Sequence, residues 1–440
     1  MTIDPRLRAA VHELVEAIPV PAVAPPVILP AARRSWRPAL VSAATAVVVV
    51  VLLLAVGLVR LPVAPGVPAA GSATLPRVFA GHSYFTATVS AAPAGPAIAV
   101  YGYGQGDLPF QTPQLIAVGV DGRTYREIDL ASKRGQPVDA PLWKSPAAPV
   151  LLSPDGVRVA VADARGPVHD VAIVDLTTGR TRSYPVPAGS AVQLLAWSPD
   201  STRLAYAVAP YRADSHGDPR VALAADGELT VLDLATSGTS TVAGQRGALA
   251  AAFSPDGGTL AVQVGTELRL LTAGGRSAVV PLPAGHRLGG PAAWSPDGRR
   301  LALFRVAAGS PSWATGYWSP DGLAVLDLPS GVSTPLNTNA TAVLGWQGAD
   351  LLASTGDAIV SVPVAVPPAG PARVLARLQP GNDHWIDTVQ LATARTGDLQ
   401  VRDTGVDRGP WPWWLRMLSV GLLVLAGGVV LVLLRRRRAG

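Results

Sequence analysis

The sequence predicts a mainly β protein: a propeller of about six four-stranded antiparallel blades, with seven as the alternative, flanked by two transmembrane α-helices. Three observations support this fold class. A short turn phrase returns at nearly regular spacing, strand-like hairpins accompany each copy, and a long uncharged stretch stands near each end of the chain. A repeat of about 40 residues built from short strands and turns is typical of a radial array of small sheets.

The returning phrase is Ser-Pro-Asp followed by Gly or Ser, and the aspartates of four copies are spaced by 45, 56 and 41 residues. A fifth copy, Ser319-Pro320-Asp321-Gly322, follows only 24 residues later, and we interpret it as a loop inside a blade. Proline presets φ at the first corner of a β-turn, aspartate can bond its own backbone, and glycine accepts a positive φ. Ser201 replaces the glycine in the second copy, so we expect that turn to be strained or longer. The predicted structural turn residues are Pro154, Asp155, Gly156, Pro199, Asp200, Pro255, Asp256, Gly257, Pro296, Asp297 and Gly298.

Each phrase stands between two apolar segments, which predicts a hairpin. A second hairpin follows, with a strand that ends in Asp-Leu or a similar pair before a turn containing Gly. Two hairpins make one four-stranded blade. Degenerate copies at 97–118 and 344–362 predict further blades, and we expect residues 388–392 to close the ring with the first blade.

The aromatic-Ser-Pro-Asp-Gly turns, together with the strand ends in Asp-Leu followed by Thr-Gly or Ser-Gly, resemble the TolB-type, WD40-like propeller repeat of bacterial envelope proteins. The resemblance covers roughly residues 75–400. It implies a propeller fold in the envelope, but the same ring supports unrelated functions. Similar propellers also cap prolyl-oligopeptidase-type peptidases, whereas this sequence holds no Gly-x-Ser-x-Gly nucleophile elbow.

Two stretches are long and apolar enough to cross a bilayer. Residues 39–59 carry no charge, and the second predicted transmembrane helix, 415–434, contains 18 uncharged residues from Met417 to Leu434. Arginines stand before the first stretch and directly after the second. The positive-inside rule then places both termini in the cytoplasm and the propeller outside, in a two-pass protein of the cell membrane. The alternative is that the first stretch is a cleaved signal peptide.

These assignments divide the chain into seven segments. We expect a cytoplasmic tail with a short amphipathic helix and a Pro-rich tether, the first transmembrane helix, a linker, the extracytoplasmic propeller, a second linker with a belt of tryptophans, the second transmembrane helix and an Arg-rich cytoplasmic tail. Their ranges are 1–38 (the helix at 4–18), 39–59, 60–74, 75–400, 401–414, 415–434 and 435–440.

The formal net charge of +6 is carried by the two tails, +2 in residues 1–38 and +4 in residues 435–440, so the rest of the chain is neutral. We therefore interpret the basic residues as topology determinants and predict no nucleic-acid partner. The chain has no cysteine, which excludes thiolate metal sites and cysteine nucleophiles.

The helix predicted at 4–18 has an apolar face formed by Leu7, Val11, Leu14, Val15 and Ile18. An isolated helix of this length is marginal and needs a partner. The tail loosely resembles those that precede the first span in actinobacterial envelope proteins that govern sigma factors. It therefore suggests a cytoplasmic protein partner, and an inert tail lying on the membrane is the alternative.

No catalytic residue, metal site or cofactor is predicted. The six histidines lack metal-ligand spacing. Asp214, His216 and Asp218 could hold a cation, but we favour a solvated loop. Long loops on a rigid ring often carry binding residues, and aromatic side chains are typical anchors. The candidate binding residues are therefore aromatic, with packing against neighbouring blades as the alternative: Tyr101, Tyr103, Phe110, Trp313, Tyr317 and Trp318.

The sequence thus favours a membrane-anchored propeller that binds a protein, peptide or polymer outside the cell membrane without catalysis, as a binding module or scaffold of the bacterial envelope. Its expected partners are the lipid bilayer, a protein or peptide outside, and a cytoplasmic protein at residues 4–18. One alternative is a transmembrane regulator or sensor that acts through this cytoplasmic helix. A second alternative is a hydrolase or lyase with a site in the central channel.

Overall fold

The computed structural model describes residues 73–411 except for several gaps, together with scattered helical residues between 415 and 428. The predicted cytoplasmic tail, the first apolar stretch and the Arg-rich C-terminal tail lie outside the described residues. The gaps are 82, 104–113, 136–147, 164–166, 213–219, 273, 307–319, 365–369, 379–385 and 412–414.

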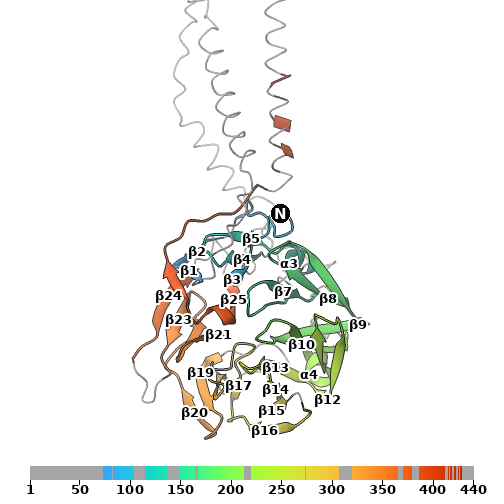
Figure 1. The fold of residues 1–440 in the computed structure, drawn as a ribbon, viewed down its shortest axis with the longest axis vertical. Helices are drawn as coiled ribbons and strands as arrows, with labels where there is room; N and C mark the ends of the chain where they lie inside the picture. Colours follow the sequence, from blue (N-terminus) through green and yellow to red (C-terminus); the bar gives the residue numbers. More distant parts are fainter. Residues whose placement is uncertain are drawn as a thin grey trace, which may run out of the picture. The chain divides into compact units, whose positions relative to one another are not determined.

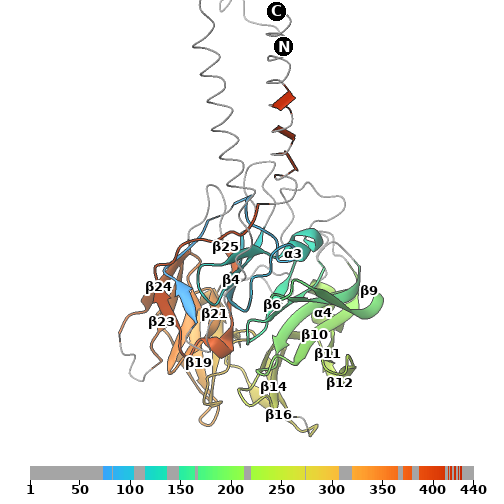
Figure 2. The ribbon, with the colours of Figure 1, turned by 45° about the horizontal axis from the view of Figure 1, so that its top comes forward.

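The described domain is mainly β, and its sheets follow one another around a ring as the blades of a propeller (Figures 1 and 2). Two blades are four-stranded sheets whose strands pair in chain order and run antiparallel. The first consists of β13 (Ala248–Phe253), β14 (Thr259–Val264), β15 (Glu267–Thr272) and β16 (Ser277–Pro281). The second consists of β17 (His286–Leu288), β18 (Arg300–Val306), β19 (Pro320–Asp327) and β20 (Val332–Pro335).

The next blade contains β21 (Ala342–Gln347), β22 (Asp350–Ser354), β23 (Ala358–Val362) and β24 (Arg373–Leu378), and the short β2 (Val78–Phe79) adds a parallel fifth strand beside β24. A fourth blade, which we call the closing blade, has the order β25-β3-β4-β5. Its strands are β25 (Ile386–Leu391), β3 (Ala97–Tyr103), β4 (Leu115–Gly119) and β5 (Tyr125–Glu127).

The remaining part of the ring is one seven-stranded antiparallel sheet, in the order β12 to β6. The sheet is continuous because β9, 17 residues long, pairs with β8 through its first half and with β10 through its second. Four separate blades and this larger sheet therefore replace the six separate blades that we predicted. The strands are β6 (Val150–Leu152), β7 (Arg158–Val161), β8 (Val168–Asp175), β9 (Thr181–Trp197), β10 (Arg203–Pro210), β11 (Glu228–Asp233) and β12 (Thr239–Arg246).

The ring closes between strands from opposite ends of the domain. C-terminal β25 pairs antiparallel with β3, which confirms the closure predicted for residues 388–392. A second closure pairs β1 (Thr74–Pro76) in parallel with β26 (Gln400–Arg402). Because these pairs join the start of the domain to its end, the sheets form a closed circle and no large sheet edge is left open at the seam.

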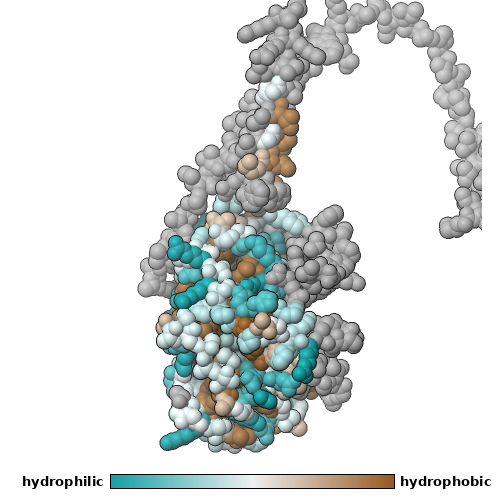
Figure 3. Space-filling model, turned by 90° about the vertical axis from the view of Figure 1, so that its right-hand side faces the viewer, coloured by the Kyte–Doolittle hydropathy of each residue, from teal (hydrophilic) through white to brown (hydrophobic). Residues whose placement is uncertain are grey.

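Apolar residues on both faces of the blades fill the spaces between neighbouring sheets. Every residue of β3, β4 and β23 is buried, as expected for strands covered on both sides. Many of these core residues are alanines, which allow neighbouring sheets to approach closely. On the face seen in Figure 3, hydrophilic and neutral side chains cover most of the propeller.

Two short helices, α3 (Asp129–Arg134) and α4 (Arg220–Asp226), and a single 3₁₀ turn at Thr393–Arg395 interrupt the β structure. Within the part of the chain that the structure describes, no helix has the length and hydropathy needed to cross a membrane. The first predicted span, 39–59, lies outside that part, and only scattered residues of the second, 415–434, are described.

Candidate functional site

The repeated phrase forms four tight turns at the inner strands of the ring. In each turn the backbone N–H of the fourth residue donates to the serine carbonyl oxygen at 2.8 to 2.9 Å. The glycines at the fourth position have φ near +70°, a conformation that glycine adopts without strain. The donors are Gly156, Ser201, Gly257 and Gly298.

The aspartates of the phrase are held within their own turns. Each accepts a hydrogen bond from the serine hydroxyl at 2.5 Å and another from a backbone N–H two residues further on. The hydrogen bond from Ser254 to Asp256 lowers the pKa of that carboxyl, and Ser295 has the same effect on the pKa of Asp297. These carboxylates stabilise turns and are not oriented toward a substrate.

The Ser201 copy has the same length as the others, so the expectation of a longer turn was wrong. Its backbone has φ +59°, which is unfavourable for a residue with a Cβ. Its hydroxyl accepts a hydrogen bond from the backbone N–H of Asp155 at 3.1 Å, in the preceding turn. Ser201 therefore lacks the conformational freedom of the glycines in the other turns, but its hydroxyl adds a hydrogen bond to the preceding turn.

Tryptophans at the inner strands join each sheet segment to the one before it. The indole N–H of Trp197 donates to the carbonyl oxygen of Leu151 at 3.0 Å. Trp294 makes the same kind of bond to Ala252 at 2.9 Å, and Trp346 bonds to Ala293 at 3.2 Å. Each indole thus satisfies a backbone carbonyl of the preceding inner strand while its ring packs between sheets.

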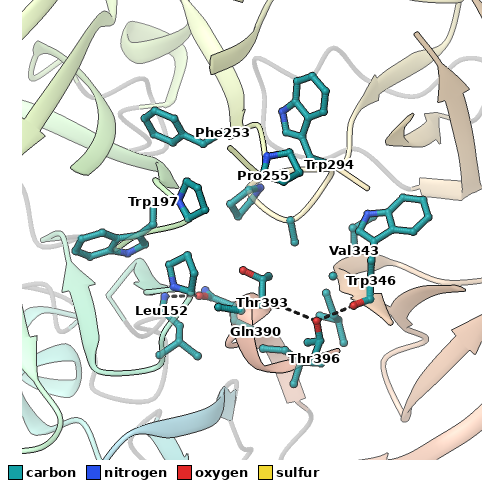
Figure 4. Close-up of a pocket in the computed structure, with 18 of the residues that line it drawn as sticks. Leu152, Trp197, Phe253, Pro255, Trp294, Val343, Trp346, Gln390, Thr393 and Thr396 are labelled. Carbon is teal, nitrogen blue, oxygen red and sulfur yellow. Dashed lines mark hydrogen bonds between the residues drawn. The ribbon is translucent and has the colours of Figure 1, made fainter. Parts of the chain in front are cut away.

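Gln390 joins β25 to β6 with two hydrogen bonds. Its amide donates to the carbonyl oxygen of Val150 at 2.8 Å, and its carbonyl oxygen accepts from the N–H of Leu152 at 2.8 Å. Close to it, the buried Thr396 hydroxyl donates toward the carbonyl oxygen of Trp346 at 2.6 Å (Figure 4). The polar groups at this centre are therefore already paired within the protein.

These inner residues surround a cavity of about 340 Å³ at the axis of the ring (Figure 4). The lining is contributed by the inner strands and turns of every part of the ring. Prolines of all four repeated turns face it, with aromatic and aliphatic residues between them. The lining residues include Leu152, Pro154, Trp197, Pro199, Phe253, Pro255, Trp294, Pro296, Val343, Trp346, Gln390, Thr393 and Thr396.

The chemistry of this cavity is apolar. None of the described residues that line it has an ionisable side chain, so this lining offers no general acid or base. The side chains of Gln390 and Thr396, which line the cavity, bond to backbone groups of the ring. The main contribution to ligand binding here would therefore be the burial of apolar surface.

The predicted aromatic binding residues fall into two groups. Tyr101 and Tyr103 lie in β3 with fully buried side chains, so they are not the exposed loop residues that we expected. The small Gly102 between them lets both rings pack in the core on the same side of the strand. The other four candidates, Phe110, Trp313, Tyr317 and Trp318, lie outside the described residues, and their binding role stays a prediction.

The buried tyrosines form a structural cluster. The hydroxyls of Tyr101 and Tyr103 both donate to the carbonyl oxygen of Ala80, at 2.7 and 2.5 Å. Burial raises the pKa of Tyr103 and of Tyr125 to about 12, and it raises the pKa of Tyr101 well above its usual value. These phenols stay neutral near pH 7 and fix the segment around Ala80 against β3.

Among the described residues, no group of histidine and carboxylate side chains is arranged to hold a metal ion. The segment with Asp214, His216 and Asp218 lies outside them. The sequence reasoning missed the axial cavity, although the tryptophans that precede the repeated turns could have indicated it. Trp197 and Trp294 stand directly before two of the repeated turns, with Phe253 at the equivalent place between them, and Trp346 stands before the turn at Gln347-Gly348.

No family model matches the sequence, and no curated protein is significantly similar to it. Solved propeller structures are similar in fold. TolB from Acinetobacter baumannii shares 15% identity, with 67% of each chain covered and a TM-score of 0.42. An oligogalacturonate lyase in complex with manganese shares 14% identity over 69% of this chain and 86% of its own, with a TM-score of 0.41.

A puromycin hydrolase shares 16% identity over 69% of this chain and 49% of its own, with a TM-score of 0.39. Enzymes and TolB proteins thus both occur among the similar structures, and these similarities do not assign an activity. The repeated turns and the ring of antiparallel sheets make the described domain a β-propeller.

Proposed function

We propose that this chain is a non-catalytic binding propeller of the bacterial envelope, anchored in the cell membrane, which receives an apolar segment of a protein or peptide in its axial cavity. The observation that carries the proposal is the lining of that cavity: prolines, tryptophans and aliphatic side chains, without an ionisable group among the described residues. The two apolar stretches of the sequence would anchor the propeller, with both termini in the cytoplasm.

The size and polarity of the cavity support a peptide ligand. A volume of about 340 Å³ is at the lower end for small-molecule sites and accommodates one or two apolar side chains. A carbohydrate would lose hydrogen bonds to water and find few polar side chains to replace them, because the lining is mostly apolar and Gln390 and Thr396 already bond to the backbone. A polysaccharide is therefore a weaker candidate than an apolar peptide segment.

We also infer that the seven-stranded sheet counts as two blades, which gives six in total. Its inner strand β6 and the second half of β9 both lead to turns that line the cavity, as the inner strands of the separate blades do. The first half of β9 is then the outer strand of a blade that also contains β6, β7 and β8. The second half of β9 is the inner strand of a blade that also contains β10, β11 and β12.

The same lining argues against an enzyme at this site. Hydrolysis or elimination at neutral pH needs a nucleophile, an acid, a base or a metal close to the substrate. The described lining contains no such group apart from the hydroxyls of Thr393 and Thr396, and the Thr396 hydroxyl is bonded to backbone carbonyls.

Filling the cavity tests the proposal. Ala292 lines it, so we expect Ala292→Phe to reduce the affinity for apolar peptides at least tenfold, because the added ring occupies the space. Binding by the full chain in nanodiscs would be measured with labelled peptide libraries that vary in apolar content. Ala278→Phe is the matched control, because Ala278 is exposed on the outer strand β16.

Two outcomes would contradict the proposal. One is equal binding by parent and Ala292→Phe, which would place the peptide site elsewhere. The other is turnover of a peptide or oligosaccharide that Ala292→Phe abolishes, which would indicate an enzyme.

Cysteine labelling tests the proposed topology, because the natural chain has no cysteine. Ser277 is exposed on the propeller, so Ser277→Cys should react with a membrane-impermeant maleimide in intact cells. Ser35→Cys, in the tail before the first apolar stretch, should react only after permeabilisation. The reverse pattern would show that the propeller is cytoplasmic.

A further inference from the structure

The segments that lead into and out of the propeller both lie against its outer edge. β5 is the outermost strand of the closing blade, in the order β25-β3-β4-β5. Asp407 forms a parallel bridge with Thr124, and Thr88 forms one with Glu127. Residues 86–89 and 407–409 thus lie at the rim of the ring, whereas the cavity lies at its axis.

Several polar contacts hold the two segments together. The N–H of Ala87 donates to the carbonyl oxygen of Arg408 at 2.8 Å. The Arg408 guanidinium donates to the Thr86 hydroxyl at 2.8 Å and to the carbonyl oxygen of Gly81 at 2.7 Å. The largely buried Arg126 side chain donates to the carbonyl oxygen of Asp407 at 2.8 Å. Residues 403–409, which lie within the segment 401–414 that we predicted as a linker, are therefore docked on the closing blade.

Large aromatic side chains stand where these segments meet. Tyr84 and Phe85 are 46% and 49% exposed, and the rings of Phe85 and Trp411 are 6.1 Å apart. We call Tyr84, Phe85 and Trp411 the rim patch. Trp411 is less exposed than Tyr84 and Phe85. Partly exposed tyrosine and tryptophan are the residues that membrane proteins place at the level of the lipid headgroups.

The chain itself brings the rim patch to the bilayer. Only residues 412–414 separate Trp411 from residue 415, where the second predicted transmembrane helix begins, so the two positions are at most about 14 Å apart. Met417, Leu418, Leu422 and Leu425 are helical, and their side chains are 50% to 67% exposed. A helix with such a surface is stable when lipid or another apolar phase covers it.

We infer that the propeller stands on its rim at the membrane, with the rim patch in the headgroup layer and the axis of the ring parallel to the bilayer plane. The inference rests on the proposed function only in requiring that residues 415–434 cross the bilayer. Its consequence is that the axial cavity opens sideways. A partner reaches the cavity along the membrane surface and need not enter between propeller and lipid.

Fluorescence quenching by lipids tests this orientation in the full chain. Single cysteines would carry an environment-sensitive fluorophore in nanodiscs that contain lipids spin-labelled near the headgroup. Val406, 50% exposed within the docked segment, is the rim probe. Val279, 57% exposed on β16, is its matched control, and Pro291, which lines the cavity, is the mouth probe. We expect at least twofold stronger quenching for Val406→Cys than for Val279→Cys and Pro291→Cys.

The double change Tyr84→Ser and Phe85→Ser should then reduce quenching at position 406 at least twofold, because it removes two rings of the rim patch. Both residues are half exposed, so thermal unfolding should remain unchanged and serves as the folding control. Equal quenching at all three probes, or the strongest quenching at position 291, would overturn the inference.

Alkaline washing of the membranes separates the two proposals. Release of the chain would show that it is not anchored, which overturns the proposed function and the rim orientation together. Retention of the chain without quenching at position 406 would overturn the rim orientation alone.

Discussion

The contact between the closing blade and the β6–β7 hairpin, which we call the closing junction, differs from the other contacts between neighbouring blades. At the ordinary junction of Trp294, two side-chain hydrogen bonds join neighbouring sheets: the indole N–H donates to the carbonyl oxygen of Ala252, and Gln263 accepts from the N–H of Leu288. At the closing junction Gln390 makes two hydrogen bonds, the Arg395 guanidinium donates to the carbonyl oxygen of Asp155, and the N–H of Ala394 donates to the carbonyl oxygen of Pro154.

The difference follows from the order of the chain. At ordinary junctions the contacting residues of the two inner strands are 42 to 56 positions apart, so the chain between them already keeps them close together. The closing junction brings together residues about 240 positions apart, and its contacts must offset a larger loss of chain entropy. We therefore expect substitutions at the closing junction to cost more free energy of unfolding than matched substitutions elsewhere in the ring.

The largest expected effect is at Gly156. A Cβ added there would lie 1.9 Å from the carbonyl oxygen of Ala97, on β3 of the closing blade. Gly156→Ala should therefore lower the free energy of unfolding by about 3 kcal/mol or more, since clash adds to backbone strain. Thermal unfolding of the full chain in detergent measures the loss.

Gly298→Ala is the control for this prediction. Gly298 has nearly the same φ, +69°, and an added Cβ would find its nearest atom 3.8 Å away, in Pro255. Gly298→Ala should therefore lower the free energy of unfolding only by the cost of backbone strain, about 1 to 2 kcal/mol. Equal losses at the two glycines would show that the closing junction is no more tightly packed than the others.

The second prediction concerns Gln390. Gln390→Ala leaves the carbonyl of Val150 and the N–H of Leu152 without their partners, and should cost about 2 kcal/mol. Gln193, which makes one such bond to the carbonyl oxygen of Leu249, is the matched glutamine at an ordinary junction. Gln193→Ala should cost about half as much, and a larger loss at Gln193 would reverse the proposed ranking.

Much of the fold could be predicted because its signals are local and repeated. A Ser-Pro-Asp-Gly phrase contains its own turn geometry, and the apolar segments on each side become the paired strands. The continuous β9 could not be anticipated in this way. Pro185 and Pro187 break the usual strand pattern, yet β9 continues through them to Ser190, the residue that pairs with both β8 and β10.

The site was less predictable because its contacts join distant residues. The sequence marks Trp197 as an aromatic residue before a turn, but its hydrogen-bond partner, Leu151, lies 46 positions earlier and is identified only by the fold. Alternating glycine and tyrosine around Tyr101 resembles a flexible loop, although the segment is a fully buried strand. Local patterns therefore predicted turns well and exposure poorly.

The third prediction concerns acid stability at the ordinary junctions. The hydrogen bond from Ser254 lowers the pKa of Asp256 in the folded protein, so its contribution is complete above the unfolded pKa of about 4 and is lost as the pH falls through the folded value. Asp256→Asn should lower the melting temperature at pH 7 by less than Gln390→Ala does. The difference from the parent should shrink as the pH falls from 5 to 2.5, and a constant difference would contradict the prediction.

The smallest effect is expected at Ser201, where two opposing contributions meet. Ser201→Gly removes the strain of a side chain at φ +59°, which should stabilise the turn by about 1 kcal/mol. It also removes the hydroxyl that accepts the N–H of Asp155 at 3.1 Å, which should cost about the same amount. The free energy of unfolding should therefore change by less than about 0.5 kcal/mol.

Ser201→Ala separates the two contributions, because it retains the strain and loses the hydrogen bond, and it should destabilise by about 1 kcal/mol. A Ser201→Ala variant as stable as Ser201→Gly would show that the hydroxyl contact contributes nothing to this junction.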